Sequence, residues 1–167
     1  MISKNAYHVL EYLYPGAHER GEYTLRDDGQ GIYIDSWNRL EPKPTDTEIR
    51  AVEPVAMAAK RESDLIEYTE ERALRHGALI KDPETDQPIA DPADDLIHIR
   101  IKTNRAKVRT TNARRRGNSE QKTKGQAAVD AEERLFLAVY DLTVDIKAGT
   151  ITTESEIDAA IAAVPLN

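Results

Sequence analysis

The chain contains no cysteine, one phenylalanine, one tryptophan and two methionines among its 167 residues. The absence of cysteine excludes disulfide bonds, thiolate nucleophiles and cysteine-based zinc sites, and it is the usage expected in a reducing cytoplasm. Aromatic residues make up 5% of the chain, charged residues make up 32%, and the mean hydropathy is −0.62. We therefore expect a modest hydrophobic core and a large solvated surface.

Long hydrophobic runs are also missing. No stretch approaches the roughly 18 consecutive apolar residues that a membrane-spanning helix requires. The first residues do not combine a charged segment with an apolar one, as a secretory signal peptide would. We therefore expect a soluble protein that is made in the cytoplasm and has no membrane partner.

No group of residues indicates catalysis or metal binding. The acids show no catalytic spacing, and the turn at residues 27–31 lacks the ligand register of an EF-hand. The histidines form no HxH or HExxH motif and lie far apart in sequence, at His8, His18, His76 and His98. We predict no enzymatic activity, no catalytic residue, no metal site and no cofactor.

Charge is distributed very unevenly along the chain. Residues 99–124, called the basic segment below, carry ten Lys or Arg and one acid. The overall net charge is −7, so the rest of the chain carries −16. Such a segregation predicts an anionic partner for the basic segment. The candidate partner-binding residues there are Arg109, Arg114, Arg115 and Arg116.

Three interpretations of the basic segment remain open: a solvated or disordered loop, a contact with acidic protein, or a contact with nucleic acid. The acidic protein could be a second copy of this chain, in a homo-oligomer. Nucleic acid is the weakest candidate partner, because the segment has no aromatic side chain to stack on bases and the acidic remainder repels DNA.

The N-terminal residues predict a helix followed by a β-hairpin. Residues 2–14 have apolar side chains at helical spacing, and Pro15-Gly16 would end that helix. Residues 22–26 and 32–37 alternate as strands do, and Asp27-Asp28-Gly29-Gln30-Gly31 has the composition of a tight turn.

Six of the nine aromatic residues lie at or before Trp37. Trp37 with Tyr12, Tyr14 and Tyr33 suits the core of a small unit, and a platform for a carbohydrate or a peptide is the alternative. Tyr14, Tyr33 and Trp37 are our candidate fold-critical and partner-binding residues in this part of the chain.

The middle of the chain predicts a helical spacer and a linker. Thr45 and Glu48 have capping-box spacing, so a helix should begin there and run to Gly77, which would end it in the left-handed conformation. Pro54 should kink or break this Ala-rich helix. Residues 78–95 are an acidic, Pro-rich linker.

Residues 96–102 are ambiguous. Ile97, Ile99 and Ile101 alternate as in a strand, whereas Ile97, Ile101 and Val108 share a helical face. We favour a strand.

The last part predicts two helices. Residues 126–147 show a 3.5-residue apolar spacing interrupted by Glu132, and Thr153 to Glu156 is a second capping box. The prediction is thus an α+β chain in five parts. They are a helix-plus-hairpin docking unit at 1–44, a helical spacer at 45–77, the linker at 78–95, a basic arm at 96–125, and a C-terminal helical hairpin at 126–167.

Four sequence elements together resemble a known family. In order, they are Tyr12 to Ala17, Asp27 to Gly31, Tyr33 to Asn38, and Pro42 to Thr45. This order is similar to the small XkdW-type proteins of bacteriophage tail modules, over roughly residues 5–60. The resemblance implies a tail-associated structural or assembly role without catalysis, and it provides no catalytic residues.

The resemblance therefore implies a structural virion protein in the baseplate or tail-fibre attachment region, made in the host cytoplasm, with other phage tail or fibre proteins as partners. Two alternatives remain. One is a tail-fibre assembly chaperone absent from the mature particle. The other is a nucleic-acid-binding protein that uses the basic segment.

Overall fold

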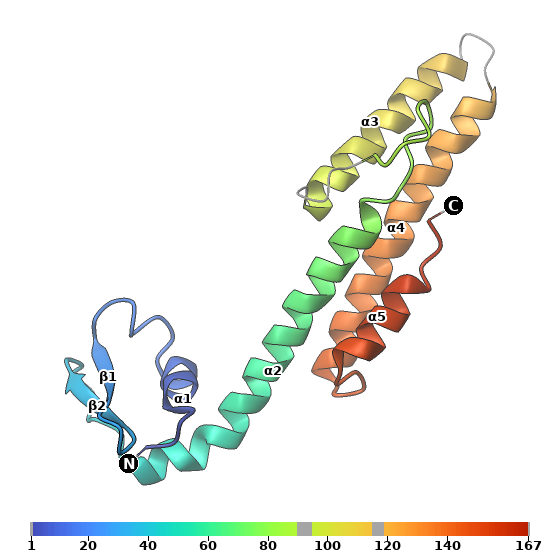
Figure 1. The fold of residues 1–167 in the computed structure, drawn as a ribbon. Coiled ribbons are helices and arrows are strands. Elements are labelled where there is room, and N and C mark those ends of the chain that lie inside the picture. The colour runs from blue at the N-terminus through green and yellow to red at the C-terminus, as the bar shows by residue number, and fades with distance from the viewer. Residues whose placement is uncertain (1, 90–94, 115–118, 167) are drawn as a thin grey trace. The chain divides into compact units, whose positions relative to one another are not determined.

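The computed structural model describes residues 2–89, 95–114 and 119–166, and the side chains of all of these except residues 112–114 and 121. The chain has the predicted α+β composition and divides into two compact units, unit 1 (Met1–Ser63) and unit 2 (Asp64–Asn167) (Figure 1). Its elements are α1 (Ala6–Leu13), β1 (Tyr23–Asp27), β2 (Ile32–Trp37), α2 (Asp46–Gly77), α3 (Leu96–Arg114), α4 (Ser119–Lys147) and α5 (Glu154–Ala162).

Unit 1 is the predicted helix packed with a β-hairpin. α1 ends at Leu13, just before Pro15-Gly16. In the turn, Asp27 Oδ1 accepts a hydrogen bond of 2.9 Å from the Gly29 N–H, and Gly29 has a φ of +84° that favours glycine. α1, the hairpin and the start of α2 share one core, formed by Ile2, Ala6, Val9, Leu10, Ala17, Tyr23, Ile34, Ile49 and Ala56.

The hairpin contains a β-bulge at Asp35. Thr24 pairs with Ser36 and Leu25 pairs with Ile34, so Asp35 has no partner across the antiparallel ladder. An extra residue shifts the two-residue alternation of side chains by one position. The shift allows Ile34 and Trp37, three residues apart, to pack against the same core.

α2 begins as predicted but differs from the prediction at two other points. The Glu48 N–H donates to Thr45 Oγ1 (3.2 Å), and Glu48 Oε2 accepts from the Thr45 N–H (2.7 Å), which completes the capping box. The prediction at Pro54 was a kink or a break, and a break does not occur, because α2 continues without interruption to Gly77. Gly77 is not left-handed.

α2 was predicted as a helical spacer, and it also contributes buried side chains to the cores of both units. Ile49 and Ala56 lie in the core of unit 1, whereas Leu65 and Ala73 lie in the core of unit 2. Thr69 is fully buried as well, and its hydroxyl donates to the Leu65 carbonyl (2.8 Å).

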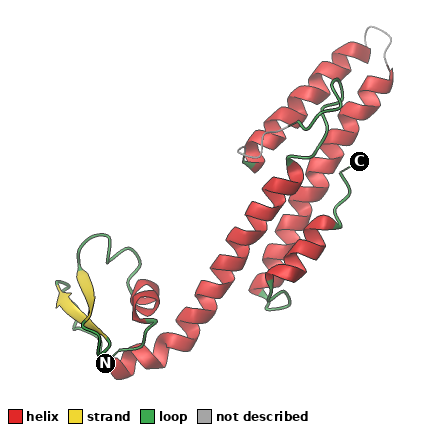
Figure 2. Ribbon diagram, in the orientation of Figure 1, coloured by secondary structure: helices red, strands yellow, loops and turns green. Residues whose placement is uncertain are grey.

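Unit 2 consists of helices joined by loops, whereas β1 and β2 lie in unit 1 (Figure 2). The strand predicted at residues 96–102 is wrong, because these residues form the beginning of α3. The buried face of α3 is Ile99, Thr103, Ala106 and Thr110, which recur at the helical spacing of four, three and four residues. Two of the four are threonines, so the apolar pattern of the true face is weak in the sequence.

The threonines are compatible with burial because their hydroxyls are bonded within the helix. Thr103 Oγ1 donates to the Arg100 carbonyl, and Thr110 Oγ1 donates to the Lys107 carbonyl, both at 2.9 Å. α3 packs along α4, and α5 packs beside the later part of α4 (Figure 1). α4 begins at Ser119, seven residues before the predicted start at Gln126.

The predicted linker at 78–95 is partly integrated into unit 2. Ile80 is fully buried, and the Ile89 N–H donates to its carbonyl at 2.6 Å. Lys81 and Pro88 form an isolated antiparallel bridge. Residues 90–94 of this segment lie outside the described residues.

Candidate functional site

The aromatic cluster of unit 1 consists of Tyr14, Tyr23 and Trp37. Tyr14 meets Trp37 edge to face with ring centroids 5.3 Å apart, and Tyr23 stacks on Trp37 at 6.1 Å. The Trp37 indole N–H donates to the Glu41 carbonyl (2.7 Å), so its polar edge is bonded. These contacts are those of a packed aromatic core, one of the two interpretations that the sequence leaves open.

Arg39 covers one side of the aromatic cluster. Its guanidinium carbon lies 4.6 Å from the centre of the Tyr14 ring, in a cation–π arrangement. The same guanidinium is ion-paired with Glu22 and, at 3.2 Å, with Glu41. A hydrogen bond from Arg20 is the largest cause that lowers the pKa of Glu22, so this carboxylate stays charged between two arginines. Sequence reasoning missed Arg39.

Tyr23 is the most deeply buried member of the aromatic cluster, and it was not among the candidate residues. Its side chain is inaccessible to solvent, and its hydroxyl has no hydrogen-bond partner among the described atoms. Burial is the largest cause, and the nearby Glu11 carboxylate the next, that together raise the pKa of Tyr23 from the usual 10.0 to about 12. The signal in the sequence was the alternation that places Tyr23 on the face of β1 shared by Leu25.

Tyr33 lies apart from the aromatic cluster. It is adjacent to the buried Ile34 in β2 and therefore points to the other side of the hairpin, opposite Arg26. Of the three candidate residues in unit 1, the structure brings Tyr14 and Trp37 together and leaves Tyr33 outside.

In unit 2, the basic segment is largely helical in its described part, where it forms α3 and the first turns of α4. Arg100 donates to Glu132 Oε1 (2.8 Å) and lies 4.2 Å from the centre of the Phe136 ring. Glu132, which interrupts the apolar spacing of α4, has a side chain only 8% exposed. The ion pair with Arg100 explains how a carboxylate is accommodated on the buried face of a helix.

Arg109 also pairs within the unit. Its guanidinium contacts Asp82 (2.5 Å) and Glu84 (3.1 Å) in the loop before α3. Arg109 thus binds acidic protein groups, but those groups belong to its own chain. Arg114 is the last residue of α3, and its side chain lies outside what is described, as do Arg115 and Arg116 entirely.

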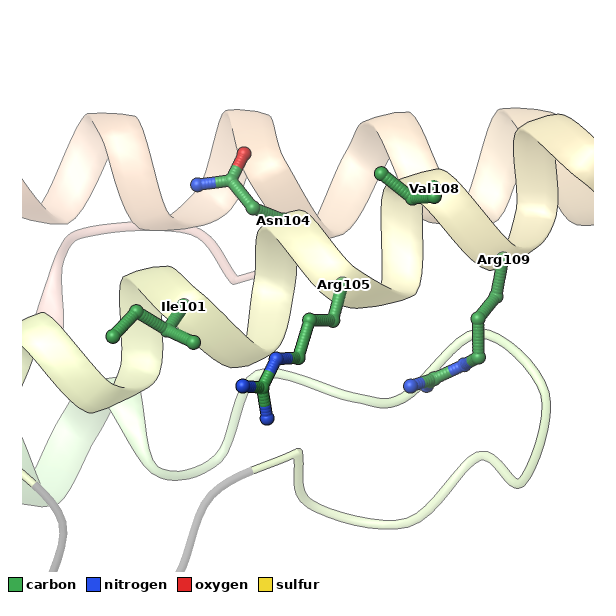
Figure 3. A pocket seen from close by; sticks show the side chains of 5 residues that line it. All are labelled: Ile101, Asn104, Arg105, Val108 and Arg109. Carbon is green, nitrogen blue, oxygen red and sulfur yellow. The ribbon is translucent and has the colours of Figure 1, made fainter.

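A groove with a cavity volume of about 580 Å³ runs along one face of α3 (Figure 3). Its lining is partly apolar and partly cationic, and the side chains of Arg105 and Arg109 point toward the loop that precedes α3. Arg105 makes no ion pair with any acid in the described ranges, which makes it more available to an external anion than Arg109. The described lining residues are Ile101, Asn104, Arg105, Val108 and Arg109.

The described ranges contain no group of three or more His, Cys, Asp or Glu side chains arranged to hold a metal ion. Within the same ranges, no helix has the length and apolar character that crossing a membrane requires.

Comparison with known proteins connects unit 1 to a family. Residues 6–61 match the family model described as XkdW protein. The phage-like element PBSX protein XkdW of Bacillus subtilis (strain 168) is 44% identical over 43 residues, which are 26% of this chain and 39% of that protein. The chain thus spans about two fifths of the length of this curated relative. No solved structure matches. The matched residues confirm the XkdW-type resemblance of the N-terminal part of the chain.

Proposed function

We propose that the protein is a non-enzymatic structural component of a bacteriophage tail, in the baseplate or tail-fibre attachment region. The observation that carries this proposal is that the match to the XkdW family, residues 6–61, coincides with compact unit 1, Met1–Ser63. A relative of this segment is named as a protein of a phage-like element. The segment that matches the family therefore also has a hydrophobic core of its own.

Unit 1 would act through protein–protein contacts. Its aromatic cluster is used for packing, so docking requires other side chains. Leu40, in the loop after β2, is fully exposed, and Tyr7 and Tyr12 of α1 are 40% and 46% exposed. Exposed tyrosines are suitable anchors for a tail or fibre protein, and burial of the fully exposed Leu40 side chain would add to the binding free energy.

The proposal is tested by quantitative mass spectrometry of purified particles. A structural component is present at a fixed stoichiometry relative to the other tail proteins. A chaperone is present in the infected or induced cell but absent from the particle, and that result would replace the proposal with the assembly alternative. Incorporation of Leu40→Asp should fall, whereas Leu79→Asp, an exposed leucine in unit 2, serves as the matched control.

Nucleic-acid binding is the second candidate, and the exposed Arg105 and Lys122 favour it. The ion pairs of Arg100 and Arg109 with internal acids weaken it. Binding of duplex DNA that falls steeply between about 50 and 200 mM salt and is weaker in Arg105→Ala would support this alternative.

A further inference from the structure

α4 has a second apolar face, opposite the one that packs in unit 2. Leu135, Leu142 and Ile146 are buried in the core of the unit. Three large apolar side chains on the opposite side are exposed, Leu137 (58%), Tyr140 (65%) and Val144 (48%), and Phe136 (43%) is exposed on the flank beside them. A surface helix normally has one apolar stripe and a polar opposite side. An amphipathic helix of a single unit does not need this second stripe.

The exposed stripe has the spacing of a helix–helix seam. Glu133, Leu137, Tyr140, Val144 and Lys147 recur at intervals of four, three, four and three residues, and all five are exposed. These intervals place all five residues on one side of the helix, with an apolar centre and one charge at each end. These five residues, together with Phe136, are called the outer face of α4 below.

The charges at the two ends determine which partner orientation fits. If a second α4 lies antiparallel across a two-fold axis at Tyr140, Glu133 of each copy comes opposite Lys147 of the other. The same axis brings Phe136 opposite Val144. A parallel pairing would instead place Glu133 against Glu133 and Lys147 against Lys147, which is repulsive at both ends. The outer face is thus complementary to itself in the antiparallel orientation alone.

We propose that the outer face of α4 binds the same face of a second copy of this chain, in an antiparallel two-fold dimer. A two-fold interface uses one patch on both subunits, and the order of charges from Glu133 to Lys147 meets that condition. The dimer goes beyond the tail function proposed above and does not depend on it, because the XkdW match ends at residue 61, before α4 begins.

The size of the outer face sets the expected affinity. Its four large apolar side chains expose on the order of 400 Å² per copy, about half of what each partner contributes to a standard interface. Arg100 already covers one side of the Phe136 ring. We therefore expect a reversible dimer with a dissociation constant of about 1–100 μM.

Sedimentation velocity of the full chain from low to high micromolar concentration tests the proposal, with five variants. Leu137→Glu should weaken dimerisation at least about tenfold, because it buries a charge at the seam. Lys147→Glu and Glu133→Lys should each weaken it by about five- to tenfold, because each replaces two attractive pairs with two repulsive ones. The double variant Glu133→Lys/Lys147→Glu should restore the wild-type affinity. Glu70→Lys, an exposed acid on α2, is the matched charge control and should change nothing.

The double variant is the decisive measurement, since rescue requires Glu133 to face Lys147 of the other copy. Thermal unfolding of each variant checks that the fold is retained. We expect it to be retained because every substituted residue is exposed. Three results would overturn the proposal. The wild-type chain could stay monomeric at every concentration, Leu137→Glu could leave the dissociation constant unchanged, or the double variant could dimerise as weakly as the single variants. Binding of this face to a helix of another protein by a monomeric chain would overturn it as well.

Discussion

Gly125 of α4 lies so close to Thr110 of α3 that there is no space between them for a methyl group. A Cβ atom at Gly125 would be 2.0 Å from Thr110 Oγ1 and 2.9 Å from Thr110 Cβ. Glycine in the middle of a helix costs about 1 kcal/mol relative to alanine. Its presence here is explained by the close approach of the two helices.

Gly125→Ala should therefore destabilise unit 2 although it increases helix propensity. We expect a net loss of about 1–3 kcal/mol in the free energy of unfolding, from overpacking against Thr110. Thr110→Ala in the same chain should recover part of the loss, because it removes the 2.0 Å contact and leaves the one at 2.9 Å. Urea denaturation of the single and double variants measures both. Greater stability of Gly125→Ala than of wild type would show that the helices do not meet here.

Arg100 and Arg109 both form ion pairs with acids. Because those acids differ in exposure, we expect substitution of the two arginines to lower the free energy of unfolding by different amounts. Arg100→Met leaves the buried Glu132 carboxylate without its partner and should cost about 2 kcal/mol. Arg109→Met affects the more exposed Asp82 and Glu84 and should cost at most about 1 kcal/mol. Denaturant unfolding of the two variants provides the comparison.

Adding Glu132→Met to Arg100→Met should recover most of the lost stability, because the buried charge is then removed. No recovery in this double variant would show that Arg100 acts mainly through its contact with Phe136.

The unpaired hydroxyl of Tyr23 predicts a stabilising substitution. Tyr23→Phe removes a buried polar group that has no described partner, so the free energy of unfolding should rise by about 1 kcal/mol. Differential scanning calorimetry of the full chain measures this change. A loss of stability would indicate that the hydroxyl has a hydrogen-bond partner in solution.

The same residue predicts a pH dependence. The folded-state pKa of Tyr23 is raised from 10.0 to about 12, so folding favours the protonated phenol. This contribution to stability is complete below pH 10 and is lost as the pH rises from 10 to about 12. The stability advantage of Tyr23→Phe over wild type should therefore grow over this interval. Comparing the two proteins cancels the contributions of the other tyrosines.

The capping box of α5 stabilises the start of that helix, so removing its threonine side chain should lower stability. Thr153 Oγ1 accepts from the Glu156 N–H (3.4 Å) and donates to the Glu156 carboxylate (2.8 Å). Thr153→Ala should cost about 1 kcal/mol. Thr152→Ala is the matched control, because Thr152 contributes its backbone N–H to Glu156 and keeps it in the variant.

The effect of Thr153→Ala should also depend on pH. The Thr152 N–H, followed by the Thr153 hydroxyl, lowers the pKa of Glu156 below its ordinary 4.5. The bonds to its carboxylate therefore stabilise the fold above pH 4.5 and are lost as the pH falls through the lowered pKa. The difference between wild type and Thr153→Ala should narrow in acid. A difference that stays constant through the acid titration of Glu156 would exclude the carboxylate from the cap.

Features that depend on neighbouring residues in the sequence could be predicted from it. The caps at Thr45 and Thr153 and the turn at residues 27–31 require short spacings and specific side chains, and all three are observed. The XkdW-type pattern of the N-terminal part was visible for the same reason, since its elements lie in order along a short stretch. These features form by contacts within about five residues, so the chain itself contains the information.

The candidate site was predicted less completely. Tyr14 and Trp37 meet as the clustering of aromatics suggested, but Asp35 forms a bulge that decides which side Trp37 faces. The partners of Arg100 and Arg109 are on other elements, 32 and 27 positions away in sequence. The sequence indicated an excess of positive charge in residues 99–124. It did not indicate which acids would pair with these side chains.

Local sequence thus determined where α2 and α5 begin, where the hairpin turns and which part carries the family pattern. The tertiary structure decided that residues 96–102 are helical, that Glu132 is buried, and that Gly77 and Gly125 lie at close helix contacts. The physical reason is that a buried face can be built from threonine, alanine and glycine when another helix supplies the apolar surface. The identity of such a face depends on the partner helix, and its own residues show little hydrophobic periodicity.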